Sequence, residues 1–231
     1  MESSARTPRE KMYGTRPMRC KTLWYGFVEI YADVVTPITL LRKLAQIDSR
    51  FFLLESVEGG NKWGRYSFLG VNPLLQISAK AGVVTLKSGA IEQKLQRDPM
   101  DALREQLNRY KSPKIDRMPS FTGGFVGHFS YEMIGYAEPK LKLKSSEFDD
   151  YNLMLFDKVI AYDHLKQKIV VIVNYYSDKG EQGYNAALLE IDKIIHLIYD
   201  NTPLMPETAQ EDVEFTCNTS KEEYCTMVER T

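Results

Sequence analysis

Residues 53–70 read LLESVEGGNKWGRYSFLG and place two apolar segments on either side of a glycine-rich turn. This pattern predicts two β-strands joined by a loop, with Glu55 and Ser56 at the end of the first strand. The glycines allow backbone N–H and C=O groups to approach a ligand closely. A carboxylate, a hydroxyl and the charge of Lys62 suit an α-amino acid, whose ammonium needs acceptors and whose carboxylate needs donors. The alternative is a structural hairpin in which Glu55 pairs with Arg65.

The chain before and after this segment alternates between short strands and amphipathic helices. Thr36-Pro37 and Asp98-Pro99 are predicted helix starts, because each joins an N-cap side chain to a proline that needs no N–H. Between them, apolar runs separated by glycines and by Asn72-Pro73 predict a meander of antiparallel strands. These runs are residues 51–55, 65–69, 74–78, 83–86 and 91–95.

The second half of the chain continues in the same manner. Strands are predicted at residues 125–129, 152–162 and 168–175, the last two joined by a hairpin at 163–166. Residues 180–199 carry apolar side chains at helical spacing, and Ser220 with Glu223 forms a capping box that opens a final helix. The sequence therefore predicts an α+β fold of antiparallel sheet layers with flanking helices.

Four parts are predicted from these patterns and from the resemblance described below. They are a flexible leader at residues 1–22, a folded domain at 23–200, a proline-containing linker at 201–214 and the start of a second domain at 215–231.

The composition narrows the classes of function. Of 231 residues, 30 are Lys or Arg and 31 are Asp or Glu, so the net charge is −1. This balance argues against binding of nucleic acid through a broad basic face. The longest aliphatic run is too short to cross a bilayer, and the basic leader lacks the apolar core of a secretory signal peptide. A cytoplasmic protein without a nucleic-acid or membrane partner is expected.

No set of catalytic or metal-binding residues stands out. The chain lacks the common phosphate-binding, dinucleotide-binding, metalloprotease and nucleophile-elbow motifs. Cys20, Cys217 and Cys225 are not at metal-ligand or redox spacing and are expected to lie in the core. The histidines are dispersed: His128 is expected to be at least half-buried, His164 to be solvated in a turn, and His196 to lie near a helix C-terminus.

Residues 53–70 resemble the N-terminal signature of anthranilate synthase component I, in which LLES is followed by a glycine-rich turn and RYSFxG. Further matches to this family follow in the right order. They are EIYADVVTP at residues 29–37, FTGGFVGHFSY at 121–131, NLMLFDKVIAYDH at 152–164, and the pattern N-x-[ST]-x-x-x-[YF]-x-x-x-V at 218–228. The sequence departs from the family at His128, where a tyrosine is usual. The chain is thereby identified as similar to the N-terminal portion of this chorismate-utilising family.

The resemblance implies a function and a regulatory site. Members convert chorismate to anthranilate and pyruvate, with Mg²⁺ and with ammonia that an amidotransferase subunit releases from glutamine. The N-terminal part carries the site for feedback inhibition by L-tryptophan, which by motif match is expected to use Ser56 with Glu55 beside it, and Lys62 as a further candidate. The residues that bind chorismate and Mg²⁺ belong to the other half of the family's fold. The chain is thus expected to be truncated, to hold no catalytic or metal residues, and to be inactive alone.

Two other functions are compatible with the sequence. One is that of aminodeoxychorismate synthase component I, which acts on chorismate in folate synthesis, although the run KWGRYS at residues 62–67 resembles the tryptophan-pathway enzyme better. The other is a non-catalytic module that binds an amino acid.

Overall fold

The computed structural model describes residues 23–33, 35–55, 64–116, 118–138, 140–141, 147–202 and 216–230. The chain divides into two compact units, one ending at Asn201 and one beginning at Thr202. The predicted leader lies outside the described residues, as do most of the predicted linker and Cys20.

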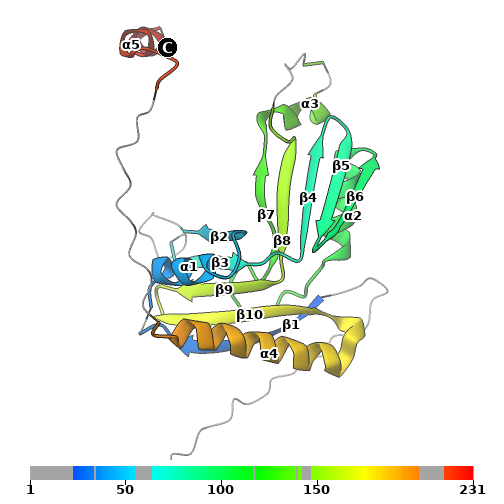
Figure 1. The fold of residues 1–231 in the computed structure, drawn as a ribbon, viewed down its shortest axis with the longest axis vertical. Helices are drawn as coiled ribbons and strands as arrows, with labels where there is room; N and C mark the ends of the chain where they lie inside the picture. The colour runs from blue at the N-terminus through cyan, green and yellow to red at the C-terminus, as the bar shows by residue number, and fades with distance from the viewer. Residues whose placement is uncertain are drawn as a thin grey trace, which may run out of the picture. The chain divides into compact units, whose positions relative to one another are not determined.

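The first unit combines runs of strands with helices between and after them (Figure 1). Its elements are β1 (Leu23–Tyr31), α1 (Pro37–Ala45), β2 (Phe51–Leu54), β3 (Tyr66–Val71), β4 (Leu75–Lys80), β5 (Val83–Ser88), β6 (Ile91–Gln96), α2 (Pro99–Arg109), β7 (Gly124–Phe129), η1 (Tyr131–Met133), α3 (Ile134–Ala137), β8 (Tyr151–Phe156), β9 (Lys158–Asp163), β10 (Lys168–Tyr176), η2 (Ser177–Lys179) and α4 (Gly180–Tyr199). The described part of the second unit contains α5 (Lys221–Glu229).

The predicted helix starts are confirmed. Thr36 Oγ1 accepts a hydrogen bond from the Thr39 backbone N–H at 3.2 Å, and Asp98 Oδ1 accepts one from the Asp101 backbone N–H at 2.8 Å. Ser220 begins α5 with both hydrogen bonds of its capping box. Each of these caps satisfies a backbone donor that the first turn of a helix leaves without a partner.

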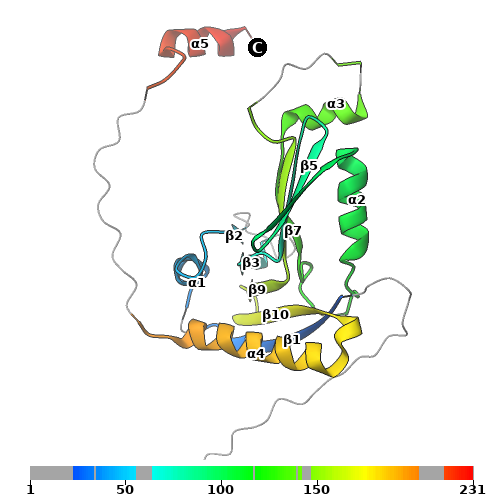
Figure 2. The same cartoon turned by 45° about the vertical axis from the view of Figure 1, so that its right-hand side comes forward.

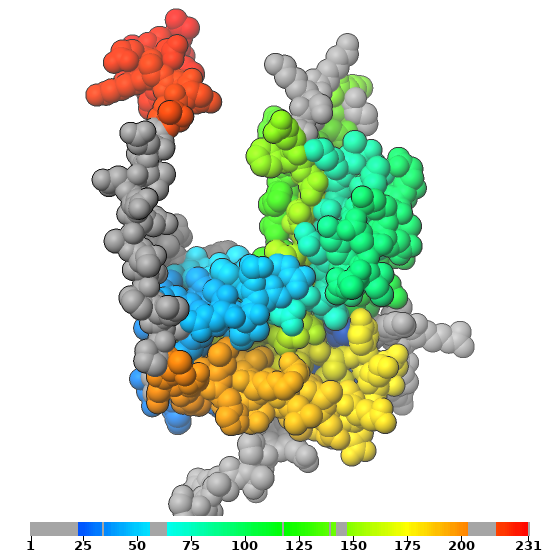
Figure 3. Space-filling view, in the orientation of Figure 1, coloured from blue at the N-terminus to red at the C-terminus, as the bar shows by residue number. Residues whose placement is uncertain are grey.

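The strands form two antiparallel sheets, as the predicted fold class requires. The first has the order β1-β10-β9-β3-β2 and the second the order β6-β5-β4-β8-β7. Helices α1 and α4 pack on one face of the first sheet, where Leu40, Leu44, Val171 and Ile191 are buried in one cluster. In Figure 3 these two helices lie side by side on the surface.

Helix α2 packs on the second sheet, and Figure 2 shows the helix beside it. Its Ala102 and Leu103 join a cluster with Ile77 and Val84 of the sheet. The Tyr151 hydroxyl of β8 is buried and donates a hydrogen bond to the Pro99 carbonyl at 2.9 Å, which ties the start of the helix to the sheet.

The prediction of one long strand at residues 152–162 is wrong. The chain turns at Asp157, so that β8 pairs with β4 and β7 in the second sheet while β9 pairs with β3 and β10 in the first. The backbone and side-chain amides of Asn174 both donate to the Asp157 carbonyl, at 2.7 Å and 2.9 Å. These hydrogen bonds stabilise the turn. The sequence does not reveal it, because the apolar residues on both sides resemble one continuous strand.

The predicted single meander is wrong for a related reason. Strands β2 and β3 belong to the first sheet, whereas β4, β5 and β6 belong to the second. The chain changes sheet at Asn72-Pro73, where Asn72 adopts a left-handed φ of 53°. Asparagine tolerates this conformation and proline cannot continue a ladder, so the dipeptide ends one sheet before the next begins.

Three further expectations are corrected. Cys217 and Cys225 are exposed. Cys225 belongs to α5, none of whose residues is buried within the described part of its unit, and Cys217 precedes that helix. His128 is also exposed, because β7 is the edge strand of the second sheet and its C-terminal half has little packed against it.

Candidate functional site

The residues expected to bind an amino acid lie where β2 ends and β3 begins. Glu55 directly follows β2 and is exposed. Ser56 and Lys62 lie outside the described residues, so the structure does not place them. The site is therefore built from Glu55 and from its neighbours on β3 and on the turn between β9 and β10.

Glu55 is held by a hydrogen-bonded chain of three side chains. Ser67 of β3 is fully buried, and its hydroxyl donates to Glu55 Oε1 at 3.2 Å. The same hydroxyl oxygen lies 2.7 Å from His164 Nε2. His164 is exposed in a turn, as predicted from the sequence, and its ring is in addition hydrogen-bonded to Ser67.

Arg65 does not pair with Glu55. Its guanidinium instead forms a bidentate ion pair with Asp163, with 2.6 Å between Nη2 and Oδ2 and 3.1 Å between Nε and Oδ1. Burial alone would raise the pKa of Asp163, but the hydrogen bonds from Arg65 and from the turn's backbone outweigh it and hold that pKa below its usual range. The alternative prediction, a hairpin in which Glu55 pairs with Arg65, is therefore wrong. The Glu55 carboxylate lies at the end of β2 and Arg65 binds Asp163 instead.

The turn between β9 and β10 is itself firmly held. Asp163 Oδ1 accepts hydrogen bonds from the backbone N–H groups of Leu165 and Lys166, at 3.1 Å and 3.0 Å. The His164 backbone N–H donates to the Arg65 carbonyl at 2.9 Å. Through these bonds the turn presents His164 to Ser67.

Strand alternation places aromatic side chains on the opposite face of β3. Successive residues of a strand point to opposite faces, so Tyr66 and Phe68 lie away from Ser67. The rings of Tyr66 and Phe68 stack with centroids 5.7 Å apart, and the Arg65 guanidinium lies 4.8 Å from the Tyr66 ring centroid. Burial raises the pKa of the Tyr66 hydroxyl. The end of β3 is thus polar on one face and aromatic on the other.

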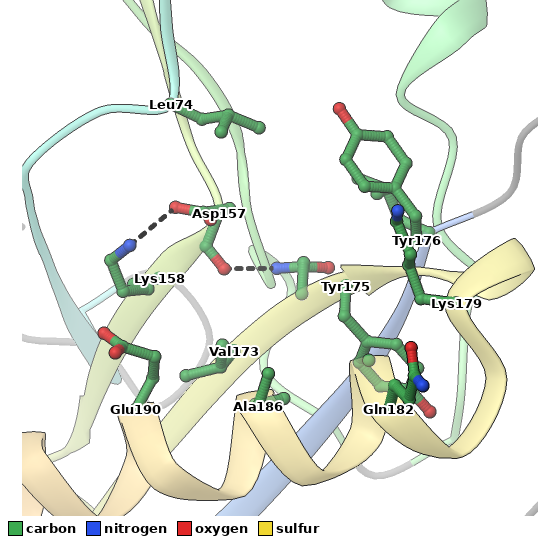
Figure 4. Close-up of a pocket in the computed structure, with 14 residues that line it drawn as sticks. Leu74, Asp157, Lys158, Val173, Tyr175, Tyr176, Lys179, Gln182, Ala186 and Glu190 are labelled. Atoms are coloured by element: carbon green, nitrogen blue, oxygen red, sulfur yellow. Dashed lines mark hydrogen bonds and ion pairs between the residues drawn. The ribbon is translucent and has the colours of Figure 1, made fainter. Parts of the chain in front are cut away.

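A separate cavity of about 360 Å³ lies between α4 and the junction of the two sheets (Figure 4). It exists because α4 presents the small residues Gly183, Ala186 and Ala187 to it. Lys158 and Asp157 line it as an ion pair, with 3.3 Å between Nζ and Oδ1. None of the residues expected to bind an amino acid is among its described lining.

The described residues contain no group of three or more His, Cys, Asp or Glu side chains that could hold a metal ion. Nor does this part of the chain contain a helix that is both long and apolar enough to span a membrane. The side chains in the described part of the chain therefore do not form a site that fits Mg²⁺.

Comparison with known proteins identifies the family. A family model described as chorismate binding enzyme matches residues 50–231, which is most of the chain. The chain belongs to the chorismate-binding enzyme family.

Two members of this family are similar over nearly the whole chain. Anthranilate synthase component 1 of Acetivibrio thermocellus is 34% identical over 212 residues, covering 87% of this chain and 43% of that protein. The Acinetobacter calcoaceticus protein of the same name is 32% identical over 224 residues, covering 90% and 44%. The chain spans less than half the length of these relatives.

A solved structure supports the same assignment. The crystal structure of anthranilate synthase component I from Streptococcus pneumoniae TIGR4 matches with a TM-score of 0.56 and 25% identity, over 87% of this chain and 43% of that one. The two antiparallel sheets with flanking helices are thus an architecture that this family member shares.

Ser67 and His164 were not singled out as site residues from the sequence. Both lie within the motifs that resemble the family, since Ser67 belongs to RYSF and His164 ends the match at residues 152–164. The contact between Ser67 and His164 depends on the pairing of β3 with β9, which brings together residues 97 positions apart. The family motifs therefore pointed to these two residues, but only the pairing of β3 with β9 shows that they are in contact.

Proposed function

We propose that this chain is the N-terminal part of anthranilate synthase component I, which converts chorismate and ammonia to anthranilate and pyruvate. The observation that carries the proposal is the 34% identity over 212 residues to a protein of that name. In this proposal a glutamine amidotransferase subunit supplies the ammonia, and chorismate and Mg²⁺ bind to residues beyond this chain. The protein acts in the cytoplasm, in tryptophan biosynthesis.

We further propose that Glu55 and Ser56 contact L-tryptophan as a feedback inhibitor, with Lys62 contributing to the same site. The exposed Glu55 carboxylate supports this proposal, because an acceptor of this kind suits the ammonium of an amino acid. Inhibition would then be a coupling free energy between the tryptophan site and the chorismate site, carried by a shift of one half of the enzyme against the other.

The test is Ser56→Arg in the full-length enzyme. A long cationic side chain would block an effector pocket without touching the substrate site, so inhibition by tryptophan should be relieved while turnover is largely retained. Gln93→Arg adds the same side chain to an exposed position on β6 and serves as the matched control. Parallel loss of turnover and inhibition in Ser56→Arg would count against the proposal.

Product analysis separates this proposal from the folate-pathway alternative. The full-length enzyme, supplied with chorismate and glutamine together with its amidotransferase subunit, should release anthranilate and pyruvate. Accumulation of aminodeoxychorismate without pyruvate would assign the protein to the other pathway. Tryptophan binding with no turnover of chorismate would instead favour a non-catalytic amino-acid-binding module.

A further inference from the structure

We propose that Ser67 and His164 are positioning residues that orient the Glu55 carboxylate toward the ammonium group of the bound amino acid. This inference rests on the proposed effector site at Glu55 and adds two residues that act through it. The proposal is based on two consecutive hydrogen bonds. His164 Nε2 lies 2.7 Å from Ser67 Oγ, and Ser67 Oγ lies 3.2 Å from Glu55 Oε1.

The direction of these hydrogen bonds follows from the chemistry of the three groups. A carboxylate can only accept, so the single proton of the Ser67 hydroxyl is committed to Glu55. The Ser67 oxygen can then only accept from His164, which means that Nε2 carries a proton. Three side chains thus form one polarised chain that ends on the carboxylate, and hydrogen bonds linked in this way strengthen one another.

Both residues are held by the fold more tightly than Glu55 itself. Ser67 is fully buried in β3, paired with Tyr162 of β9. His164 is fixed by its backbone bond to Arg65 and by its ring, whose centroid lies 4.8 Å from that of Tyr162. Glu55 is exposed just beyond the last residue of β2, so the hydrogen bond from Ser67 is what orients its carboxylate.

Orientation matters because a free glutamate side chain loses rotamer freedom when it binds a ligand. Fixing one such side chain beforehand removes a cost equivalent to about a three- to tenfold change in the dissociation constant. Ser67 and His164 would lower that cost without contacting the amino acid. Removing either hydrogen bond should therefore weaken binding by about this factor and no more.

The experiment measures the dissociation constant of L-tryptophan by calorimetry, on the full-length enzyme and its variants. Ser67→Ala and His164→Leu should each weaken binding about three- to tenfold. His164→Gln keeps an N–H donor near the position of Nε2 and should recover most of the affinity. Ser78→Ala, in β4 of the other sheet, is the matched control and should bind as the wild type does.

A double-variant cycle separates positioning from a general structural role. Once Glu55→Gln has removed the charge, Ser67→Ala should weaken binding no further, because Ser67 acts only through that carboxylate. Additive losses would overturn the proposal, as would equal affinities of His164→Gln and His164→Leu. If Ser67→Ala is too unstable for its tryptophan affinity to be measured, the comparison of His164→Gln with His164→Leu at the exposed residue still tests the proposal.

Failure of this inference can be told apart from failure of the proposed function. If Glu55→Gln weakens binding but Ser67→Ala and His164→Leu bind as the wild type does, the effector site stands and the positioning role is wrong. If Glu55→Gln itself binds with unchanged affinity, the effector site is wrong and the positioning role falls with it.

Discussion

At the scale of single residues, two buried charges hold distant parts of the first unit together. Lys43 of α1 is 8% exposed, and its ammonium donates to the carbonyls of Leu197, Ile198 and Asp200 at 3.1, 2.9 and 2.6 Å. The last carbonyls of a helix have no partner within it and carry partial negative charge. A lysine from α1 therefore caps the end of α4, which joins the two helices that cover the first sheet.

We expect Lys43→Met to lower the free energy of unfolding by about 2–3 kcal/mol, because a charged donor to three carbonyls at the end of α4 is lost while most of the packing volume is kept. Chemical denaturation measures the change. Lys193→Met, on the exposed side of α4 and paired only at the surface with Glu190, should change it by less than about 0.5 kcal/mol. Equal effects of the two substitutions would show that the cap is not stabilising.

The second buried charge is Asp163, and its depressed pKa gives stability a specific dependence on pH. A carboxyl whose pKa is lower in the folded state contributes its full stabilisation above the ordinary value of about 3.9 and loses it as the pH falls through the folded value. Asp163→Asn should therefore cost about 1–3 kcal/mol at pH 7. The difference from the wild type should shrink below about pH 4. Denaturation curves at pH 7 and at pH 3 check this, and a constant difference would contradict it.

At the scale of elements, a glycine sets how closely β7 approaches β8. A Cβ atom on Gly127 would overlap the Asn152 carbonyl oxygen and lie 2.9 Å from the Leu153 Cα. Because both obstacles are backbone atoms of the paired strand, they cannot move aside without breaking the ladder. Gly127, the last glycine in FTGGFVGHFSY, therefore has a structural role, since it lets β7 pair closely with β8.

Gly127→Ala should therefore destabilise the protein by at least about 2 kcal/mol and loosen the β7–β8 pairing. Amide hydrogen exchange across the two strands reports the pairing, and denaturation reports the total. Gly26→Ala in β1 is the matched control, because its new Cβ would meet only the tip of the Ile191 side chain at 3.3 Å. If Gly127→Ala is no more harmful than this control, the close approach is not a constraint.

At the scale of the whole molecule, the two sheets of the first unit are joined by short connections between consecutive strands, such as those from β3 to β4 and from β8 to β9. β8 belongs to the second sheet and β9 to the first, with only Asp157 between them. The polar chain from Glu55 to His164 lies entirely at one end of the first sheet. Movement of this sheet would therefore carry the proposed effector site with it, which is what coupling to a second site requires.

We expect the 231-residue chain alone to form no anthranilate from chorismate with either ammonia or glutamine. The chain spans 43% of the relative from Acetivibrio thermocellus, and its described residues contain no group suited to Mg²⁺. Anthranilate fluorescence measures the reaction, with the full-length enzyme as the positive control. A signal above that of chorismate without protein would show that this chain carries the catalytic residues after all.

The sequence by itself determined what depends on near neighbours. Helix starts at Thr36, Asp98 and Ser220 were correct because a cap is made within three residues, and the strand positions followed from local alternation. Only the tertiary structure decided which sheet each strand joins and what Glu55 contacts. The break at Asp157 depends on Asn174, 17 residues away. Glu55 accepts a hydrogen bond from Ser67, which in turn bonds His164, 97 residues further along the chain. Such hydrogen bonds form only when distant strands pair, so no local pattern encodes them.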